Sequence, residues 1–413
     1  MNLADMLSYA DIHQLNRIAS HYACECNSNS KRELIQSILN TINRKDRFEQ
    51  YVQELSLEDI RFLNSLLYDQ RELFSMEELL ARARLSRFDL PEGAALSAEP
   101  SKPAPPLSPP AGAAKPTPAK RSRSKKNSEA KTPKEWTPRD MIVRFTQQGW
   151  LFNGHSQQTK FLYQVPHDLK LRFGESLART FQKQLHIINE PPVYRDEQGA
   201  LADDLYRFLE FVHHHQIDVT SDGTMYKRSQ QTILDRFTVN EELVGKGGWR
   251  FGYGRKIKEY PNRFSLIYDY CFYNGYINEL PSELRLTAAG TEQVVQGKRE
   301  NPEALYRFWM RLYKSPIHNL QTIVAWIDRL AQRWVTVETL ESVLLRFIKP
   351  YYYDDPRSIL HQRVLPMMLH LGLVRIGEHP GEGAVIQMTK LGSSIIRGVY
   401  VQEDDRILLP EEA

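Results

Sequence analysis

The stretches Leu284-Arg-Leu-Thr-Ala-Ala-Gly290 and Ile386-Gln-Met-Thr-Lys-Leu-Gly392 are the most informative about the fold. Each joins a short apolar segment to Thr-x-x-Gly, and each follows a helix-like stretch that ends near a glycine. Glycine readily takes the left-handed conformation that closes a helix, and a threonine that leaves a strand can cap the next helix through its hydroxyl. We therefore predict helix, β-ribbon and new helix at both places. Ile217-Asp-Val-Thr-Ser-Asp-Gly223 is expected to be a third copy.

This succession is typical of the wing end of a winged-helix domain. The last copy predicts helices at residues 319–333, 336–348 and 356–371, followed by two strands that flank a wing at 377–383. Pro366 should kink the third of these helices or shift its start. We divide this part of the chain into a winged-helix-like region at 136–300 and a C-terminal winged-helix domain at 301–400.

Residues 1–90 predict about five short helices. Helix-start signals occur at Asp11, at the capping box Ser30-Lys-Arg-Glu33, at Ser56-Leu-Glu-Asp59 and at Ser75-Met-Glu-Glu78. An apolar stripe follows each of them at helical spacing. These residues therefore form a separate helical module.

Two of these helices, with the short polar turn between them, resemble the SAP motif and the helical module at the N-terminus of the Rho termination factor. The likeness covers about 30 residues, and the glycine usual before the second helix is missing, with Asn29 and Ser30 nearby. The resemblance implies nucleic-acid binding by Lys31 and Arg32. A pure packing or protein-docking role is the alternative.

Residues 91–135 predict a disordered Pro/Lys-rich linker. They hold ten prolines, and their nine Lys and Arg residues outnumber four Asp and Glu. Such a segment cannot bury enough apolar surface to offset its ordering entropy. Its basic run, Lys120-Arg-Ser-Arg-Ser-Lys-Lys126, is a solvated spacer or a sequence-independent nucleic-acid tether. Residues 401–413 form an acidic tail.

The glycine-rich stretch from Gly245 to Lys256 interleaves aromatic and basic residues. It lacks the Gly-Lys-Ser/Thr ending of a phosphate-binding loop, which argues against a nucleotide site. Stacking and backbone contacts to a nucleic acid would suit its side chains, and a structural hairpin or flexible loop is the alternative. The predicted contacts are Trp249, Arg250, Tyr253, Arg255 and Lys256.

The third helix of the C-terminal domain supplies a second set of candidates. In a winged-helix domain that binds DNA, this helix enters a groove, and here it would present Arg357, Gln362 and Arg363. The alternative is that these side chains form a solvated face, because winged helices also bind proteins.

The segment 204–228, with its helix, strand, Thr-x-x-Gly and Lys227-Arg228, resembles the N-terminal region of XPB-type DNA-repair helicases and bacterial helicase-associated proteins. The likeness implies that this region, including Lys227 and Arg228, engages DNA or a superfamily 2 helicase. The sequence lacks Walker and DEAD-type motor motifs, which indicates an accessory protein.

Motifs for catalysis and metal binding are weak. Cys24, Cys26 and Cys271 lack the spacing of a four-ligand zinc site, and His213-His-His215 cannot point at one ion from a helix. The lone Glu-x-Lys, at Glu129-Ala-Lys131, lies in the linker, which makes a metal-dependent nuclease the less favoured reading. We predict no enzyme activity, no cofactor and no metal. No apolar run is long enough for a bilayer, and we expect a cytoplasmic protein without a membrane partner.

The sequence therefore predicts a mainly α protein with small β-ribbons, made of an N-terminal helical module, a disordered linker and tandem winged-helix domains. The predicted function is a non-catalytic nucleic-acid-binding accessory, associated with a helicase in DNA repair, recombination or transcription, that binds duplex or single-stranded DNA. The main alternative is a winged-helix protein-interaction scaffold. The formal net charge of +3 over 413 residues gives no bulk positive field, which favours the scaffold somewhat.

Overall fold

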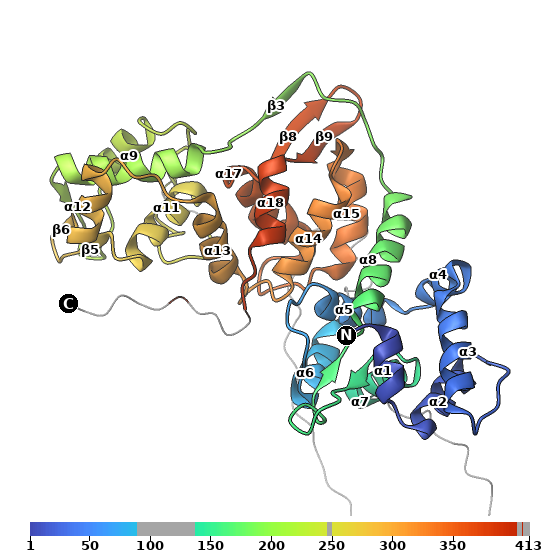
Figure 1. Ribbon diagram of the computed structural model, residues 1–413. Helices are drawn as coiled ribbons and strands as arrows, with labels where there is room; N and C mark the ends of the chain where they lie inside the picture. The colour runs from blue at the N-terminus through green and yellow to red at the C-terminus, as the bar shows by residue number, and fades with distance from the viewer. Residues whose placement is uncertain (89–136, 246–249, 403–406, 408–413) are drawn as a thin grey trace, which may run out of the picture.

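The computed structural model describes residues 1–88, 137–245, 250–402 and 407. The predicted linker at 91–135, most of the predicted acidic tail and the candidate Trp249 lie outside the described residues. The described chain is mainly helical with small antiparallel sheets, as the sequence predicts. The N-terminal helices and the C-terminal unit adjoin, and the middle unit lies beyond the C-terminal unit (Figure 1).

Four helices open the chain, and the predicted start signals at Asp11 and Ser30 begin two of them, α2 and α3. Asp11 accepts a hydrogen bond from the Gln14 backbone at 2.7 Å, and Ser30 accepts one from the Glu33 backbone at 3.4 Å. The helices are α1 (Leu3–Tyr9), α2 (Ile12–His21), α3 (Lys31–Asn43) and α4 (Lys45–Gln53).

A first unit follows, and its chain runs on both sides of the predicted linker. Its sheet forms where Phe74 bridges to Tyr163 and β1 pairs with β2. Its elements are α5 (Leu57–Leu67), α6 (Met76–Ser86), α7 (Pro138–Gln147), β1 (Phe152–Asn153), β2 (Tyr163–Gln164) and α8 (His167–Gln182). Capping boxes at Ser56 and Ser75 start α5 and α6, as predicted.

The packing of this unit corrects the domain boundary expected at the linker. Phe62 of α5 packs edge-on against Phe145 of α7, and Arg144 of α7 forms an ion pair with Asp59 of α5. The Trp150 indole donates to the Tyr22 hydroxyl at 2.8 Å, which ties α2 to the chain after α7. Residues 89–136 are thus an insertion between two helices of one packed unit, because both flanks share its core.

The middle unit repeats this order of elements. Helix, strand and two helices are followed by two strands, and the sheet order β4-β6-β5 places the last strand between the other two. The elements are α9 (Ala200–His214), β4 (Ile217–Asp218), α10 (Lys227–Leu234), α11 (Asn262–Tyr273), β5 (Ile277–Glu279), β6 (Glu283–Leu286) and α12 (Ala288–Val295).

The C-terminal unit has the same order, and α13 (Pro302–Tyr313) precedes it. Its sheet is β3-β8-β9-β7, in which β3 (Val193–Arg195) comes from the chain before the middle unit. The remaining elements are α14 (Leu320–Leu330), β7 (Val335–Thr336), α15 (Val337–Leu344), the 3₁₀ turn Leu345–Phe347, α16 (Pro356–Ser358), the π-helix Ile359–Val364, α17 (Leu365–His370), β8 (Val374–His379), β9 (Gly383–Met388) and α18 (Lys390–Gly398). The expected disturbance at Pro366 takes the form of this π-helix.

Two of the three predicted Thr-x-x-Gly copies are confirmed as helix caps. Thr287 and Thr389 accept hydrogen bonds from the backbones of Gly290 and Gly392, at 3.1 and 2.8 Å. The same hydroxyls donate to the carbonyls of Gly275 and Gly372, which close the preceding helices at φ +67° and +69°. Each threonine thus joins the end of one helix to the start of the next.

The third copy is wrong as a cap. Thr220 lies in a turn, where its backbone carbonyl accepts a hydrogen bond from the backbone N–H of Gly223. Helix α10 begins only at Lys227, with Tyr226 as its N-cap. This copy follows the first strand of its unit, whereas the two confirmed copies follow the last strand. After the first strand, the same four-residue pattern forms a turn and does not start a helix.

Candidate nucleic-acid interface

The predicted residues of the N-terminal helices lie apart from the others along the fold. Lys31 and Arg32 open α3, where both are exposed. The Lys31 ammonium donates to the Ser8 carbonyl at 2.8 Å, which fastens α3 to α1. Arg32 keeps an exposed position at the helix start.

Lys227 and Arg228 open α10 in the middle unit. The Lys227 ammonium lies 3.1 Å from the Val244 carbonyl and 3.4 Å from the Glu259 carbonyl, which are near the two ends of the glycine-rich stretch. Burial lowers the pKa of Lys227. Lys227 therefore braces this stretch, and Arg228 is exposed beside it.

The three described basic residues of the glycine-rich stretch, Arg250, Arg255 and Lys256, all bond within the fold, contrary to the prediction that they are free to contact nucleic acid. Arg250 donates to the Tyr260 carbonyl at 2.9 Å and to Asn262. Arg255 grips Glu279 through both terminal nitrogens, at 3.2 and 3.0 Å. Lys256 is 8% exposed and donates to the Asp222 and Gly223 carbonyls at 3.0 and 2.9 Å. These three side chains hold the loop together, and Lys256 must be hydrogen-bonded because its cation is buried.

The same loop docks on the third helix of the C-terminal unit. The Tyr253 hydroxyl donates to Asp354 at 2.9 Å, and a terminal nitrogen of Arg363 donates to the Phe251 carbonyl at 2.8 Å. Arg363 also grips Asp354 at 2.9 and 3.1 Å and is 7% exposed. This corrects the prediction that Arg363 contacts nucleic acid, since its guanidinium is enclosed between the two units.

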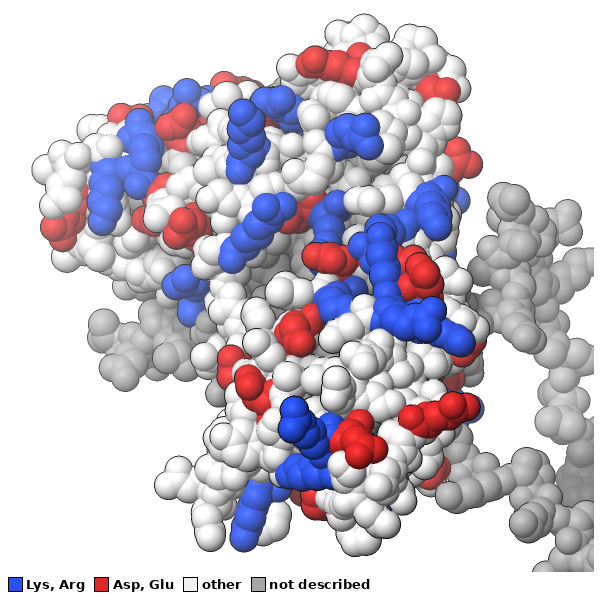
Figure 2. All heavy atoms as spheres, turned by 45° about the vertical axis from the view of Figure 1, so that its right-hand side comes forward, with Lys and Arg blue, Asp and Glu red and all other residues white. Residues whose placement is uncertain are grey.

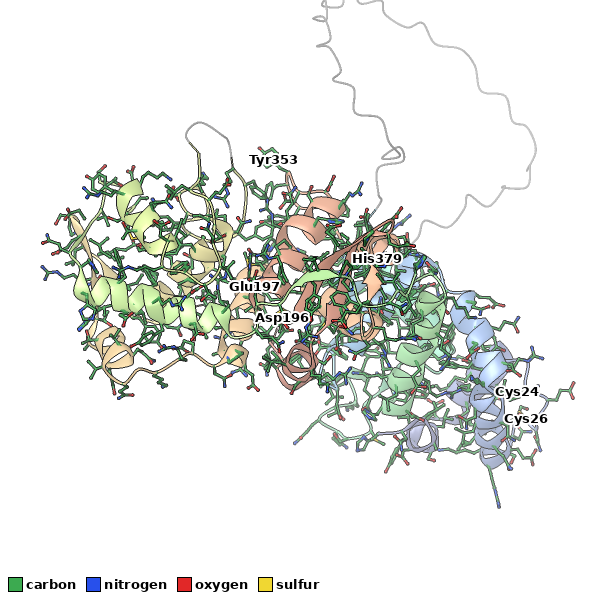
Figure 3. All side chains as sticks on the ribbon, turned by 90° about the horizontal axis from the view of Figure 1, so that it is seen from above. Cys24, Cys26, Asp196, Glu197, Tyr353 and His379 are labelled. Atoms are coloured by element: carbon green, nitrogen blue, oxygen red, sulfur yellow. The ribbon has the colours of Figure 1, made fainter. Side chains whose placement is uncertain are left out.

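Two exposed tyrosines remain at this junction. We call residues Tyr351–Tyr353, which precede the third helix, the tyrosine turn. Tyr352 is 82% exposed and has a φ of +49°, and Tyr353 is 73% exposed. A left-handed backbone is costly for a bulky side chain, so the surrounding structure must impose it. In Figure 3, Tyr353 lies at the rim of the molecule, between the middle and C-terminal units.

The predicted Arg357 and Gln362 flank this turn on the third helix. The Arg357 side chain is 68% exposed, with its Nε 3.1 Å from a carboxylate oxygen of Glu341. Gln362 is exposed. Phe251 from the glycine-rich stretch packs edge-on against Tyr353, with ring centroids 5.7 Å apart. The structure therefore brings the two predicted regions together, but around tyrosines that the sequence analysis overlooked.

The third helix of the middle unit is enclosed. Residues 263–271 of α11, its third helix, are all buried, so this helix cannot enter a nucleic-acid groove. Figure 2 shows Lys and Arg alternating with Asp and Glu over the face it views, with no continuous positive field. Affinity would therefore have to come from a local site.

The described residues show neither a cluster of metal-ligating side chains nor a membrane-spanning helix. Within 1–88, 137–245, 250–402 and 407, no three His, Cys, Asp or Glu side chains are placed to hold a metal ion. In the same part of the chain, no helix is long and apolar enough to cross a membrane.

Comparison with known proteins adds no family. No protein-family model matches this sequence, and neither a curated protein nor a solved structure matches the chain.

Proposed function

We propose that this protein is a non-catalytic nucleic-acid-binding accessory that holds unpaired bases against the tyrosine turn. The observation that carries the proposal is Tyr352, a strained and exposed aromatic residue beside the exposed Tyr353. An exposed aromatic pair offers flat surfaces on which bases of any sequence can stack. Backbone strain that persists at an exposed position is characteristic of functional sites.

The element order supports a winged-helix class for all three units. In each, helix, strand and two helices precede two strands, and the last strand pairs with the first. In the first unit, Phe74 supplies the first strand as a single bridged residue. We infer that the chain is a tandem of winged-helix units in which most connecting surface serves to hold the units together.

The polar neighbours suit a nucleic acid strand. Arg357 presents a guanidinium that can meet phosphate, and Gln362 can donate and accept hydrogen bonds at a base edge. Glu341 lies against Arg357, so phosphate would have to compete with that carboxylate. Stacking rather than charge would then supply most of the affinity. We further propose that the protein associates with a superfamily 2 helicase and acts in DNA repair, recombination or transcription.

A protein-interaction scaffold is the second candidate. The burial of Lys256 and Arg363 removes two of the predicted phosphate contacts, and the ion pair with Glu279 engages the guanidinium of Arg255, a third. Tyrosine is also enriched at protein interfaces, so the tyrosine turn would serve either function. The two candidates differ in salt dependence, because phosphate contacts release counterions.

Fluorescence anisotropy of the full chain with a short single-stranded oligonucleotide tests the proposal. Replacing Tyr352 with glycine removes the ring and permits the left-handed backbone, so we expect unchanged or slightly higher stability, by up to about 1 kcal/mol. Binding should weaken about tenfold or more, because stacking is worth about 1–3 kcal/mol per base.

Tyr9→Ala is the matched control, because Tyr9 is an exposed tyrosine of α1, outside the proposed site. It should leave binding unchanged. Equal binding by wild type and Tyr352→Gly, or no binding at low salt, would overturn the proposal and favour the scaffold.

A further inference from the structure

A cavity of about 690 Å³ lies between the first unit and the C-terminal half of the molecule. Its walls come from α5 and α6 on one side and from α13 and the start of α14 on the other. In Figure 1 these helices face one another across the middle of the molecule. The chain end after α18 forms part of its wall, through Tyr400, Val401, Gln402 and Ile407.

Among the described residues, the lining holds more cations than carboxylates, in a protein that is near neutral overall. The charged residues of this described lining are five Lys or Arg and one carboxylate: Arg61, Arg82, Arg311, Lys314, Lys349 and Asp69. Asp69 is itself held by Arg71, Arg82 and Tyr400. Although burial alone would raise it, the hydrogen bonds from Arg71 and Tyr400 hold the pKa of Asp69 at about 2. The positive charge of the remaining lining would therefore attract an acidic ligand.

Asn64 supplies a second, independent feature of a binding site. Its side chain lines the cavity and is 2% exposed, and neither atom of its amide has a hydrogen-bond partner among the described residues. A buried amide without partners costs about 1–3 kcal/mol. A side-chain amide can donate to a peptide carbonyl and accept from a peptide N–H at once. Asn64 is thus suited to hold a peptide backbone.

The chain end already shows the chemistry of the occupant. Lys314 donates to the Gln402 carbonyl at 2.9 Å, and the Tyr400 hydroxyl donates to Asp69 at 2.5 Å. Val401 is buried, and Ile407 lines the cavity. Residues 401–413 contain five Asp or Glu against a single Arg. The segment therefore combines aliphatic side chains with a negative charge that complements the lining.

We propose that this cavity is a docking site for an acidic peptide with aliphatic side chains, and that the C-terminal segment from Tyr400 onward is its intramolecular occupant. The segment would leave when a peptide of the same chemistry competes for the site. The proposal does not depend on nucleic-acid binding at the tyrosine turn, which lies elsewhere on the C-terminal unit.

The test uses the full chain and a fluorescein-labelled peptide with the sequence of residues 400–413. Changing Glu403, Asp404 and Asp405 together to lysine should expel the intramolecular segment by charge repulsion. This variant should bind the labelled peptide at least about tenfold more tightly than wild type, because in the wild type the intramolecular segment competes for the site. Adding Lys314→Glu should weaken that binding by about tenfold or more, because it removes a contact to the peptide backbone and reverses a charge.

Arg333→Glu is the control, because Arg333 is an exposed cation outside the cavity. Ile407→Asp provides a second way to release the segment should the triple variant fold poorly, and circular dichroism checks both. Equal peptide binding by wild type and both released variants would overturn the proposal, as would insensitivity to Lys314→Glu. Binding of a single-stranded oligonucleotide in place of the peptide would instead make the cavity a phosphate site.

Discussion

The middle unit and the C-terminal unit share one order of helices and strands, yet they use their third helices differently. In the middle unit, residues 263–271 of α11 are buried, and Glu241 caps the helix start by accepting from the backbones of Arg263 and Phe264. In the C-terminal unit, Arg357, Gln362 and two residues of the tyrosine turn, Tyr352 and Tyr353, are exposed. The same local design thus produced one internal helix and one open face.

The connection before each third helix explains the difference. In the middle unit, residues 235–261 separate α10 from α11, and the described part of this loop covers α11 before it reaches Asp354 and Arg363. In the C-terminal unit the connection is much shorter and ends in the tyrosine turn. A long loop can bury its own unit's surface against a neighbour, whereas a short turn leaves the surface free.

The largest expected effect separates the two arginines of the C-terminal third helix. Arg363→Ala leaves Asp354 buried without its partner and should lower the free energy of unfolding by about 3–5 kcal/mol. Arg357→Ala should change it by about 0.5 kcal/mol or less, because the Arg357 side chain is 68% exposed and Glu341 keeps its contact with His361. Urea denaturation measures both. Similar losses of unfolding free energy would contradict the placement of Arg363 in the interior and Arg357 at the surface.

A pH-dependent effect should come from Asp269 of α11, which lies under the long loop. Burial raises the pKa of Asp269 to about 7, so the native state binds a proton that the unfolded state has released. Its contribution to stability is therefore fully present near pH 4 and is lost as the pH rises toward 7, by at most about 4 kcal/mol.

Asp269→Asn should remove this slope and make the variant more stable than wild type at pH 8. Urea midpoints at pH 5 and pH 8 test it, with the exposed Asp222→Asn as control. Parallel pH profiles of wild type and Asp269→Asn would contradict the assignment.

The two glycines of the confirmed Thr-x-x-Gly copies should behave alike. A methyl group at Gly290 would collide with the Tyr276 carbonyl, and one at Gly392 with the Leu373 carbonyl. Each Gly→Ala change should cost about 2–3 kcal/mol, because these backbone atoms cannot move aside. Gly398→Ala, where a methyl group meets nothing, is the control for thermal unfolding. A loss of stability from only one of the two Gly→Ala changes would show that Gly290 and Gly392 are not equivalent.

The threonines should give the smallest effect. Thr287→Ala and Thr389→Ala each remove a helix cap and should cost about 1–2 kcal/mol. Thr220→Ala affects only a turn and should cost about 0.5 kcal/mol or less. Chemical denaturation of the three single variants ranks them. If Thr220→Ala lowered the free energy of unfolding as much as the other two changes, Thr220 would act as a third helix cap.

Part of the candidate site could be read from the sequence. The Gly245–Lys256 stretch and the third helix with Arg357 were singled out separately, and they meet in the structure. The direction of each side chain could not be read, because Arg357 and Arg363 lie on one helix and differ only in what packs over them. The run of three tyrosines at 351–353 is the signal in the sequence that points to the tyrosine turn.

The sequence by itself determined the local elements, because caps, apolar periodicity and glycine positions act over a few residues. Asp11, Ser56, Thr287 and Thr389 begin helices where their side chains can meet nearby backbone N–H groups. Only the tertiary structure decided that residues 89–136 interrupt one unit, that Arg363 is enclosed and that the tyrosine turn is open. Those outcomes depend on contacts between residues far apart in the chain, such as Asp59 with Arg144 and Phe251 with Arg363. Burial is a property of the whole packed molecule, and no short stretch of sequence encodes it.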